Sequence, residues 1–397
     1  MIIKPSIRSN FFTNAHPLGC EQFVVDQIHE AKSLPEIKGP KNVLIIGGSS
    51  GYGLASRIAL AFSAQANTLN VSYESGPRGK RTGSAGWWNN VFFQKHAAQS
   101  GHHHHDLVGD AFSRDMKAHV ADLIKRTYGK IDLLVYSLAS GARKNEQTGE
   151  TIMSHIKTIG EPLTGKTIDV AKGTVDELTV TPASSQEIAD TVFVMGGSDW
   201  QDWVNFLDEA ELLDTGFKTV SYTYIGGETT EQLYRGGTLG KAKEDLEAKA
   251  DAMDIMLKKK YQGEAIVSSS KAVITKASVF IPQMPIYVSS LLDVMKRHGV
   301  HETILEHKHR LFRDMLYGKK RDVDSLNRLR LDRFELSETV QEETYTLMRG
   351  LSDAEIMNHP ATQNFLKEFF NIHGFGYDTI DYEMPVNMER LANYMLR

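Results

Sequence analysis

Cysteine and long apolar runs are scarce in this sequence. Cys20 is the single cysteine among 397 residues, which excludes an internal disulfide and favours a reducing compartment. Nothing near Cys20 in the chain would activate its thiol, so we predict a small buried packing residue. No run reaches the roughly 18 apolar residues that a membrane span requires. The nearest run, 277–294, is interrupted by two prolines, a glutamine and an aspartate. The first residues also lack the apolar region and cleavage site of a secretory signal, and we expect a cytoplasmic protein with no membrane contact.

An excess of one charge sign is also missing. The formal net charge is −5, and the charged residues are spread along the chain rather than clustered. Binding to nucleic acid would require a basic patch, so no nucleic acid is expected as a partner. The basic stretch 318–333 is interpreted as solvated surface. With 41% hydrophobic residues the chain can bury a sizeable core, and its length allows two or three domains or one large α/β domain.

A glycine-rich turn follows the first apolar run, in the segment KNVLIIGGSSGYG at 41–53. Residues 43–46 are predicted to form a buried strand, and a helical pattern follows the glycines. In such a turn Gly47 would permit the tight bend, Gly51 would let the backbone approach a diphosphate, and Gly53 would allow close packing of helix on strand. The spacing G-x-x-x-G-x-G differs from the commonest dinucleotide fingerprint, but Glu74 closes the next apolar run, about 20 residues on, as that fingerprint requires. The sequence therefore predicts a bound dinucleotide.

Strand and helix patterns alternate from residue 41 onward. The predicted order is strand 43–46, helix 53–64, strand 69–73, helix 84–99, strand 106–108, helix 111–127 and strand 131–137. This order predicts an α/β protein with a doubly wound parallel sheet of the Rossmann type and right-handed crossovers. Residues 1–40 would add a helix that braces the sheet. Later patterns predict helices at 186–194 and 200–213, with Trp200 and Trp203 as packing residues, and a further strand at 217–226.

Three loops of this region have residues that could contribute to function. Residues 137–141, SLASG, lie at the carboxyl end of a central strand, where they would either border a cofactor or form a plain turn. The run His102–His105 could bind a metal, but adjacent histidines project in different directions and no further ligands accompany them, so no metal site is predicted. Residues 142–185 break the alternation and are interpreted as an inserted β-hairpin region that would cover a substrate.

Tyr234 and Lys243 are the candidates for chemistry. They follow the strand at 217–226, and Thr238 is predicted as the N-cap of a helix that runs to about Lys260. A nine-residue separation within one helix would place them on opposite faces, so they converge only if Gly236 and Gly237 free the tyrosine from the helix. The spacing alone is expected about once by chance in this chain. A nearby ammonium would favour the ionised form of a tyrosine, and lysine could also bind a ribose hydroxyl.

The remaining chain is less informative. Residues 263–275 predict one or two strands that end at Val273, Ile274 and Thr275. The helix expected at 286–297 would line an acyl pocket or cover the sheet, and the sequence favours neither. Residues 301–397 are predicted to be a charged helical extension without a recognisable chemical motif.

Several strings of this chain resemble the FabV-type enoyl-[acyl-carrier-protein] reductases and the similar trans-2-enoyl-CoA reductases. They span nearly the full length: MIIKP, TNAHPLGCE, VLIIGGSSGYGLASRIA, LVYSLASG, YTYIGGETTEQLYRGGTLGKAKEDLE and FFNIHGFGYD. The resemblance implies an enlarged relative of the short-chain dehydrogenases, with one reductase domain over 1–397. Its parts would be a brace (1–40), the first half of the core (41–141), the inserted hairpins (142–185), the second half (186–300) and a C-terminal helical extension (301–397).

The resemblance also implies roles for residues. Tyr234 is expected as the proton donor, Lys243 as a catalytic and cofactor contact, and Tyr224 as a substrate contact. Many relatives have Phe in place of Tyr73, a change that would preserve stacking. The other implied cofactor contacts are Gly47, Gly48, Ser49, Ser50, Gly51, Tyr52, Tyr73, Glu74, Asp110, Ala111, Leu138, Ala139, Val273, Ile274 and Thr275.

The implied reaction is NADH-dependent reduction of the 2,3 double bond of an enoyl thioester carried by acyl carrier protein or coenzyme A, the last step of fatty acid elongation. Glu74 would bind the adenosine ribose and repel a 2′-phosphate, so NADPH is less favoured. The enzyme is expected to be a monomer. Two alternatives stay open: a carbonyl reductase of the short-chain class that acts on 3-ketoacyl thioesters, and a non-catalytic NADH-binding regulatory protein.

Overall fold

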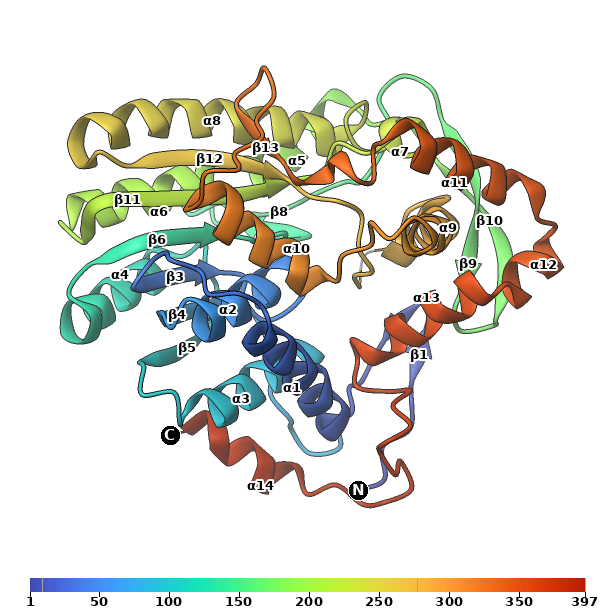
Figure 1. Ribbon diagram of the computed structural model, residues 1–397, viewed down its shortest axis with the longest axis horizontal. Helices are drawn as coiled ribbons and strands as arrows, with labels where there is room; N and C mark the ends of the chain where they lie inside the picture. The colour runs from blue at the N-terminus through green and yellow to red at the C-terminus, as the bar shows by residue number, and fades with distance from the viewer. Residues whose placement is uncertain (9, 277, 397) are drawn as a thin grey trace.

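A seven-stranded parallel sheet forms the centre of the protein (Figure 1). The computed structural model describes residues 1–8, 10–276 and 278–396. The predicted doubly wound architecture is confirmed. In spatial order the strands are β13 (Arg328–Arg330), β12 (Glu264–Ser269), β11 (Leu213–Thr223), β6 (Ile131–Tyr136), β3 (Asn42–Ile46), β4 (Asn67–Ser72) and β5 (His104–Val108).

Both faces of the sheet are buried, which explains the continuous apolar run of β3. In β3, Val43 and Ile45 pack into a core on one face, whereas Leu44 and Ile46 pack into a core on the other. The first core lies under α1 (Pro17–Ser33), α2 (Gly51–Ser63), α3 (Ala85–Ala97), α10 (Ile304–Arg310) and the π-helical turn η3 (Leu311–Leu316). The second lies under α4 (Arg114–Leu123), its π-helical continuation η1 (Ile124–Tyr128), α6 (Ser198–Glu209) and α8 (Thr238–Tyr261).

Two hairpins and a group of helices are added to the sheet, and the second hairpin and the helices lie at the right of Figure 1. The hairpins are the predicted insertion, and they pair antiparallel: β7 (Ala142–Lys144) with β8 (Thr151–Met153), and β9 (Leu163–Asp169) with β10 (Thr174–Val180). A third core joins β9 and β10 to α9 (Met284–Arg297), α11 (Glu338–Gly350), α12 (Asp353–Asn358) and α13 (Pro360–Asn371). The remaining elements are β1 (Ile7–Arg8), β2 (Phe11–Phe12), α5 (Ser185–Met195), α7 (Glu228–Glu231), η2 (Ser278–Phe280), η4 (Leu331–Arg333), α14 (Met388–Ala392) and η5 (Asn393–Leu396).

The structure corrects three expectations. The C-terminal extension is not purely helical, because β13 adds a seventh strand beside β12. The strand predicted to reach Thr275 ends at Ser269, and the chain continues without regular structure to the end of the predicted stretch. Thr238 is not the N-cap of α8: Gly237 holds that position, and the Thr238 hydroxyl instead donates to the backbone oxygen of His155 at 2.5 Å. That contact ties the helix to the hairpin region.

A buried ion pair joins α2 to the edge strand β5. The Arg57 guanidinium donates to both carboxylate oxygens of Asp106, at 2.7 and 2.9 Å, and lies 3.7 Å above the centre of the Phe93 ring. The two charged side chains are 0% and 2% exposed. This pair fixes the outermost strand of the nucleotide-binding half against the helix that follows the glycine turn.

The histidine run lies in and before β5, and its side chains diverge as the alternation of a strand requires. His104 contacts Thr68 and Ser100 and packs on Phe93, whereas His105 contacts the Tyr128 hydroxyl on the other face. Among the residues that the structure describes, no group of three or more His, Cys, Asp or Glu side chains is arranged to hold a metal ion.

Cys20 is a buried packing residue, as the sequence predicts. Cys20 is fully buried, and burial raises the pKa of its thiol to about 12. No helix within the described part of the chain is long and apolar enough to cross a membrane. The apolar run 277–294 begins at Ala277, which lies outside the described residues, and from Met284 onward it forms most of α9.

Candidate active site

The carboxyl ends of β3 and β6 lie side by side at the point where the strand order reverses. Ile46 pairs with Tyr136, and Gly47 and Ser137 follow them directly. Crevices that bind nucleotides open at such switch points. A cavity of about 850 Å³ lies at this edge of the sheet. Most of the predicted site residues line it: Gly47, Ser49, Ser50, Gly51, Tyr52, Tyr73, Glu74, Leu138, Ala139, Tyr224, Tyr234, Lys243, Val273, Ile274 and Thr275.

The glycine turn has the geometry predicted for a phosphate cradle. Gly47 has φ = 88°, and a Cβ atom there would lie 2.6 Å from the backbone oxygen of Ser137. A Cβ at Gly53 would lie 2.0 Å from the Gly47 oxygen, so only glycine permits this approach of helix to strand. At Gly51, the first residue of α2, a Cβ would meet no protein atom within 4 Å. The open side of the turn faces the cavity at the positive end of the helix, where an anion is stabilised.

Glu74 lies at the end of β4 and is held between two parts of the site. Its Oε1 accepts a hydrogen bond from the Ser49 hydroxyl of the cradle at 2.6 Å, and its Oε2 accepts one from Ser84 at the start of α3. Tyr73 beside it is 80% exposed, so its ring is available for stacking. The carboxylate is therefore fixed where the resemblance implies a ribose.

Three predicted cofactor contacts, Gly48, Asp110 and Ala111, are not among the lining residues. Gly48 faces the sheet, where its N–H donates to the Asn70 side chain at 2.8 Å. Asp110 follows the edge strand β5, and its carboxylate accepts from the backbone N–H of Phe112 at 2.9 Å. The Gly48 N–H and the Asp110 carboxylate thus form hydrogen bonds within the protein. The cofactor contacts of Gly48, Asp110 and Ala111 remain predictions.

Asn89 and Thr223 line the cavity and were not singled out from the sequence. Asn89 donates to the Ser49 oxygen at 3.0 Å, but its own Oδ1 is buried without a hydrogen-bond partner among the described residues, as is the Thr223 hydroxyl. A buried polar atom without a partner is unfavourable by roughly 1–3 kcal/mol unless a ligand or water binds it. These atoms fit a polar ligand such as a dinucleotide, which would satisfy them.

Tyr234 and Lys243 converge on the cavity, as predicted. Tyr234 lies in the turn between α7 and α8, and Lys243 lies in the second turn of α8. The Lys243 ammonium donates to the backbone oxygen of Tyr222 at 2.9 Å, and burial lowers its pKa to about 8. Lys241, two residues earlier, is exposed and pairs with Glu244 at 2.8 Å. Only the second of the two lysines thus contributes to the site.

The environment of Tyr234 differs from the sequence-based expectation. The pKa of its phenol is raised, first by burial and then by the negative charge of Glu335, and is not lowered by a lysine. Its ring meets the Tyr224 ring edge-on, with 4.7 Å between the centroids. Tyr234 is therefore held as a neutral phenol, the form that can donate a proton.

Glu335 was missed in the sequence, where it lies in the segment assigned no chemistry. Its carboxylate is 0% exposed and accepts hydrogen bonds from the Tyr224 hydroxyl at 2.8 Å, the Tyr287 hydroxyl at 2.8 Å and the Ala272 N–H at 2.5 Å. Its only signal in the chain is its position four residues after the buried Leu331, where an apolar side chain would be expected. A charge at a core position requires partners, and these come from residues distant in the sequence.

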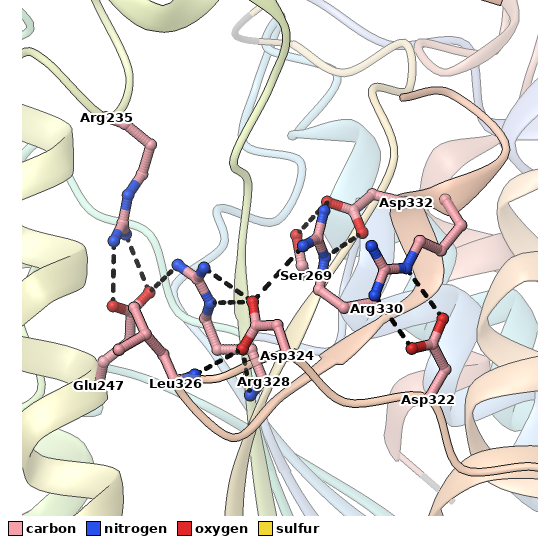
Figure 2. A network of polar contacts seen from close by, with 10 residues as sticks. Arg235, Glu247, Ser269, Asp322, Asp324, Leu326, Arg328, Arg330 and Asp332 are labelled. Atoms are coloured by element: carbon pink, nitrogen blue, oxygen red, sulfur yellow. Dashed lines mark hydrogen bonds and ion pairs between the residues drawn. The ribbon is translucent and has the colours of Figure 1, made fainter. Parts of the chain in front are cut away.

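A chain of ion pairs links the Tyr234 turn to the segment of Glu335 (Figure 2). Arg235 forms two hydrogen bonds with Glu247 of α8, at 2.9 and 3.1 Å. Glu247 also binds Arg328 of β13, which in turn pairs with Asp324. From there the contacts continue through Arg330 to Asp332, whose carboxylate accepts from Ser269 of β12 at 2.7 Å. Asp332 lies three residues before Glu335.

Apolar side chains also line the cavity. Met284 and Leu292 come from α9, and Ile156 and Met195 come from the inserted region and α5. The rest of α9 packs into the third core, so this helix both lines the cavity and covers the structure behind it. Of the two interpretations that the sequence left open, covering the sheet is wrong, because α9 packs into the third core and not into the two cores of the central sheet. The helix lines the cavity, and its role in an acyl pocket stays a prediction.

A glycine cradle at the switch point of a doubly wound sheet, with a tyrosine and a lysine beside it, defines an oxidoreductase of the short-chain-dehydrogenase type. Sequence comparison specifies the family. Residues 81–317 match the "Trans-2-enoyl-CoA reductase catalytic region", residues 2–79 the "NAD(P)H binding domain of trans-2-enoyl-CoA reductase", and residues 323–386 the "Enoyl reductase FAD binding domain". The chain belongs to the trans-2-enoyl-CoA reductase family.

Relatives of similar sequence identity are named for two different acyl carriers. An enoyl-[acyl-carrier-protein] reductase [NADH] of Photobacterium profundum is 43% identical and covers 99% of both chains. A trans-2-enoyl-CoA reductase [NADH] of Clostridium perfringens is 42% identical over 98% of this chain and 99% of the relative. The crystal structure of Clostridium acetobutulicum trans-2-enoyl-CoA reductase in complex with NADH superposes with a TM-score of 0.96, at 40% identity over 99% of this chain and 100% of that one.

The third match names FAD, and the described residues of that segment do not fit a flavin dinucleotide. Residues 323–386 contain the short strand β13 and the helices α11, α12 and α13. Within this segment the first glycine is Gly350, so no glycine-rich turn follows β13 and its described residues form no phosphate cradle of their own. What they add to the cavity are the lining residues Glu368, Asn371, Ile372 and Tyr377. The segment completes the site already described.

Proposed function

We propose that this protein reduces the 2,3 double bond of trans-2-enoyl thioesters with NADH. The observation that carries the proposal is that Tyr234, Lys243, the glycine cradle and apolar side chains all line one cavity. The relatives named above are NADH-dependent enoyl thioester reductases, and nothing in the comparisons supports a carbonyl reductase.

The residues that line the cavity have different roles in this reaction. NADH supplies the hydride that reaches the β carbon of the substrate. Negative charge then develops on the thioester oxygen, and a hydrogen bond donated by Tyr234 stabilises it. Protonation of the α carbon then gives the saturated thioester. The Tyr234 hydroxyl has no hydrogen-bond partner among the described residues, so it is available for that contact. Its raised pKa keeps the proton in place until the charge develops.

A second set of lining residues binds the cofactor. The cradle binds the diphosphate, Lys243 the nicotinamide ribose, and Glu74 the adenosine ribose. A carboxylate at Glu74 repels a 2′-phosphate and favours NADH over NADPH. Gly48, Asp110 and Ala111 are proposed as further contacts.

Three finer points belong to the same proposal. The acyl group is carried by acyl carrier protein or coenzyme A, as the names of the two groups of relatives suggest. The enzyme acts as a monomer in the cytoplasm, the compartment that a single buried cysteine favours.

The test follows NADH oxidation with crotonyl-CoA and with acetoacetyl-CoA. We expect turnover with the enoyl substrate. Turnover with the keto substrate alone would establish the carbonyl reductase, and tight NADH binding without any turnover would establish the regulatory protein. Enoyl groups on the two carriers, compared side by side, identify the preferred carrier.

A further inference from the structure

The buried carboxylate of Glu335 is contacted by three groups that can donate to it. The hydroxyls of Tyr224 and Tyr287 donate to Oε1, and the backbone N–H of Ala272 donates to Oε2. Burial raises the pKa of this carboxyl, whereas these three hydrogen bonds and the positive charge of the buried Lys271 side chain oppose the shift and favour the ionised form.

A directed series of hydrogen bonds fixes which way the protons point. The Tyr345 hydroxyl donates to Gln341 Oε1 at 2.9 Å, which orients the Gln341 amide. The Gln341 nitrogen donates to the Tyr287 oxygen at 3.0 Å and to the Glu335 backbone oxygen at 2.7 Å. Tyr287 therefore has its own proton left for Glu335. Gln341 therefore contacts the backbone of Glu335 directly and its carboxylate through Tyr287.

The same contact orients the Tyr224 hydroxyl, which donates to Glu335 at 2.8 Å and lies 3.5 Å from the Thr230 hydroxyl. Thr230 donates to the Gly227 oxygen, so the Glu335 carboxylate is the acceptor for the Tyr224 proton, and Tyr224 has only lone pairs left for the cavity. Tyr234 lies against the Tyr224 ring, and its hydroxyl does not donate to Glu335. Two tyrosines thus line the reacting end of the cavity, but the protein leaves only one of them free to donate.

We propose that Glu335 is a positioning residue that turns the proton of Tyr224 away from the substrate, so that Tyr234 is the only tyrosine that donates to the thioester oxygen. The inference rests on the proposed enoyl reduction and deepens it. It assigns to the C-terminal segment a part in the reaction that does not involve a flavin. Glu335 acts through Tyr224 and touches neither substrate nor cofactor.

Substitution Glu335→Gln tests this role. A glutamine side chain has one acceptor oxygen and an NH₂ group, so it cannot accept from both the Ala272 N–H and the two tyrosine hydroxyls. Because a backbone N–H is fixed whereas a hydroxyl can rotate, the oxygen stays with Ala272 and the NH₂ group faces Tyr224, whose proton turns toward the cavity. We expect kcat with crotonyl-CoA to fall about tenfold, while KM for NADH changes less than twofold, because the glutamine oxygen still accepts from Ala272 and so keeps the neighbouring predicted cofactor contacts, 273–275, in place. The exposed Glu338→Gln, three residues further on, is the matched control and should retain wild-type kinetics.

A double-mutant cycle with Tyr224→Phe separates positioning from a general loss of structure. If Glu335 acts through the Tyr224 hydroxyl, Glu335→Gln lowers kcat about tenfold in the wild type and less than twofold in Tyr224→Phe. Effects that multiply, or a loss of NADH binding with Glu335→Gln, overturn the proposal. Should the glutamine variant fail to fold, Glu335→Asp replaces it in the same cycle, because a carboxylate shortened by one carbon cannot reach both the Ala272 N–H and the Tyr224 hydroxyl.

The wild-type assay distinguishes the two proposals. Failure of the wild-type protein to oxidise NADH with any enoyl thioester refutes the proposed function. Turnover by the wild type combined with independent effects in the cycle refutes the role of Glu335 alone.

Discussion

The ammonium of Lys243 donates a hydrogen bond to the backbone oxygen of Tyr222, with 2.9 Å between the two atoms. The contact joins the second turn of α8 to the carboxyl end of β11, two residues before Tyr224. It places the Lys243 ammonium at the cavity that Tyr224 and Tyr234 also line. Burial brings the pKa of this lysine to about 8, so its charge changes within the range in which the enzyme can be assayed.

The first prediction is therefore a pH dependence. A lowered pKa means that Lys243 is charged below about pH 8 and neutral above it. Because NADH is an anion, kcat/KM for NADH should fall as the pH rises through about 8. Lys243→Met should lower this value about tenfold at pH 7 and remove the alkaline limb. The exposed Lys241→Met is the control, and an unchanged limb in Lys243→Met would contradict the assignment.

The second prediction concerns Tyr234. Tyr234→Phe removes the proton donor and keeps the ring, so kcat should fall by about 10²–10⁴ while NADH affinity stays nearly constant. Steady-state kinetics and the fluorescence of bound NADH measure the two quantities. Tyr261→Phe, at the far end of α8, should behave as the wild type. Turnover near the wild-type level in Tyr234→Phe would exclude it as the donor.

Cofactor preference gives a third prediction. Glu74→Ala removes both the ribose acceptor and the charge that opposes a 2′-phosphate, so the ratio of kcat/KM for NADH to that for NADPH should narrow about tenfold. The Ser49 and Ser84 hydroxyls lose an acceptor as well, and a modest rise in KM for NADH is expected. The exposed Glu36→Ala controls for loss of a surface charge. A ratio equal to that of the wild type would place the ribose elsewhere.

A fourth prediction addresses stability. Asp106→Asn leaves the Arg57 guanidinium buried without its counter-charge, which should lower the free energy of unfolding by about 3–5 kcal/mol. Urea unfolding followed by circular dichroism measures the change, and the exposed Asp122→Asn should stay within about 0.5 kcal/mol of the wild type. A loss below about 1 kcal/mol would show that the pair contributes as little as a surface ion pair.

Local patterns in the sequence predicted the nucleotide-binding half well. The strand, turn and helix around Gly47, Gly51 and Gly53 depend on residues close to one another in the chain, and the contact of Glu74 with Ser49 spans 25 positions. The convergence of Tyr234 and Lys243 was predicted for the same reason, since two glycines between them break the helix. Each of these inferences needed only short-range geometry.

Long-range contacts explain what was missed. Glu335 lies 111 residues from Tyr224, and no periodicity connects them. Thr238 has the residue type of an N-cap, but the nearby hairpin segment offered its hydroxyl a backbone oxygen, and tertiary contact outweighed the local preference. The strand β13 has only three residues, too few to show an alternation in the sequence.

The ion-pair chain that runs from Arg235 to Asp332 bears on how the molecule melts. It crosses from α8 to β13 and β12, so the segment 323–386, which sequence comparison separates as a unit, shares charges and a sheet edge with the centre of the protein. Cooperative units unfold together when their contacts are continuous. Calorimetry should show a single transition for this segment and the Tyr234 turn, and heating should abolish turnover at the temperature at which the C-terminal strand leaves the sheet.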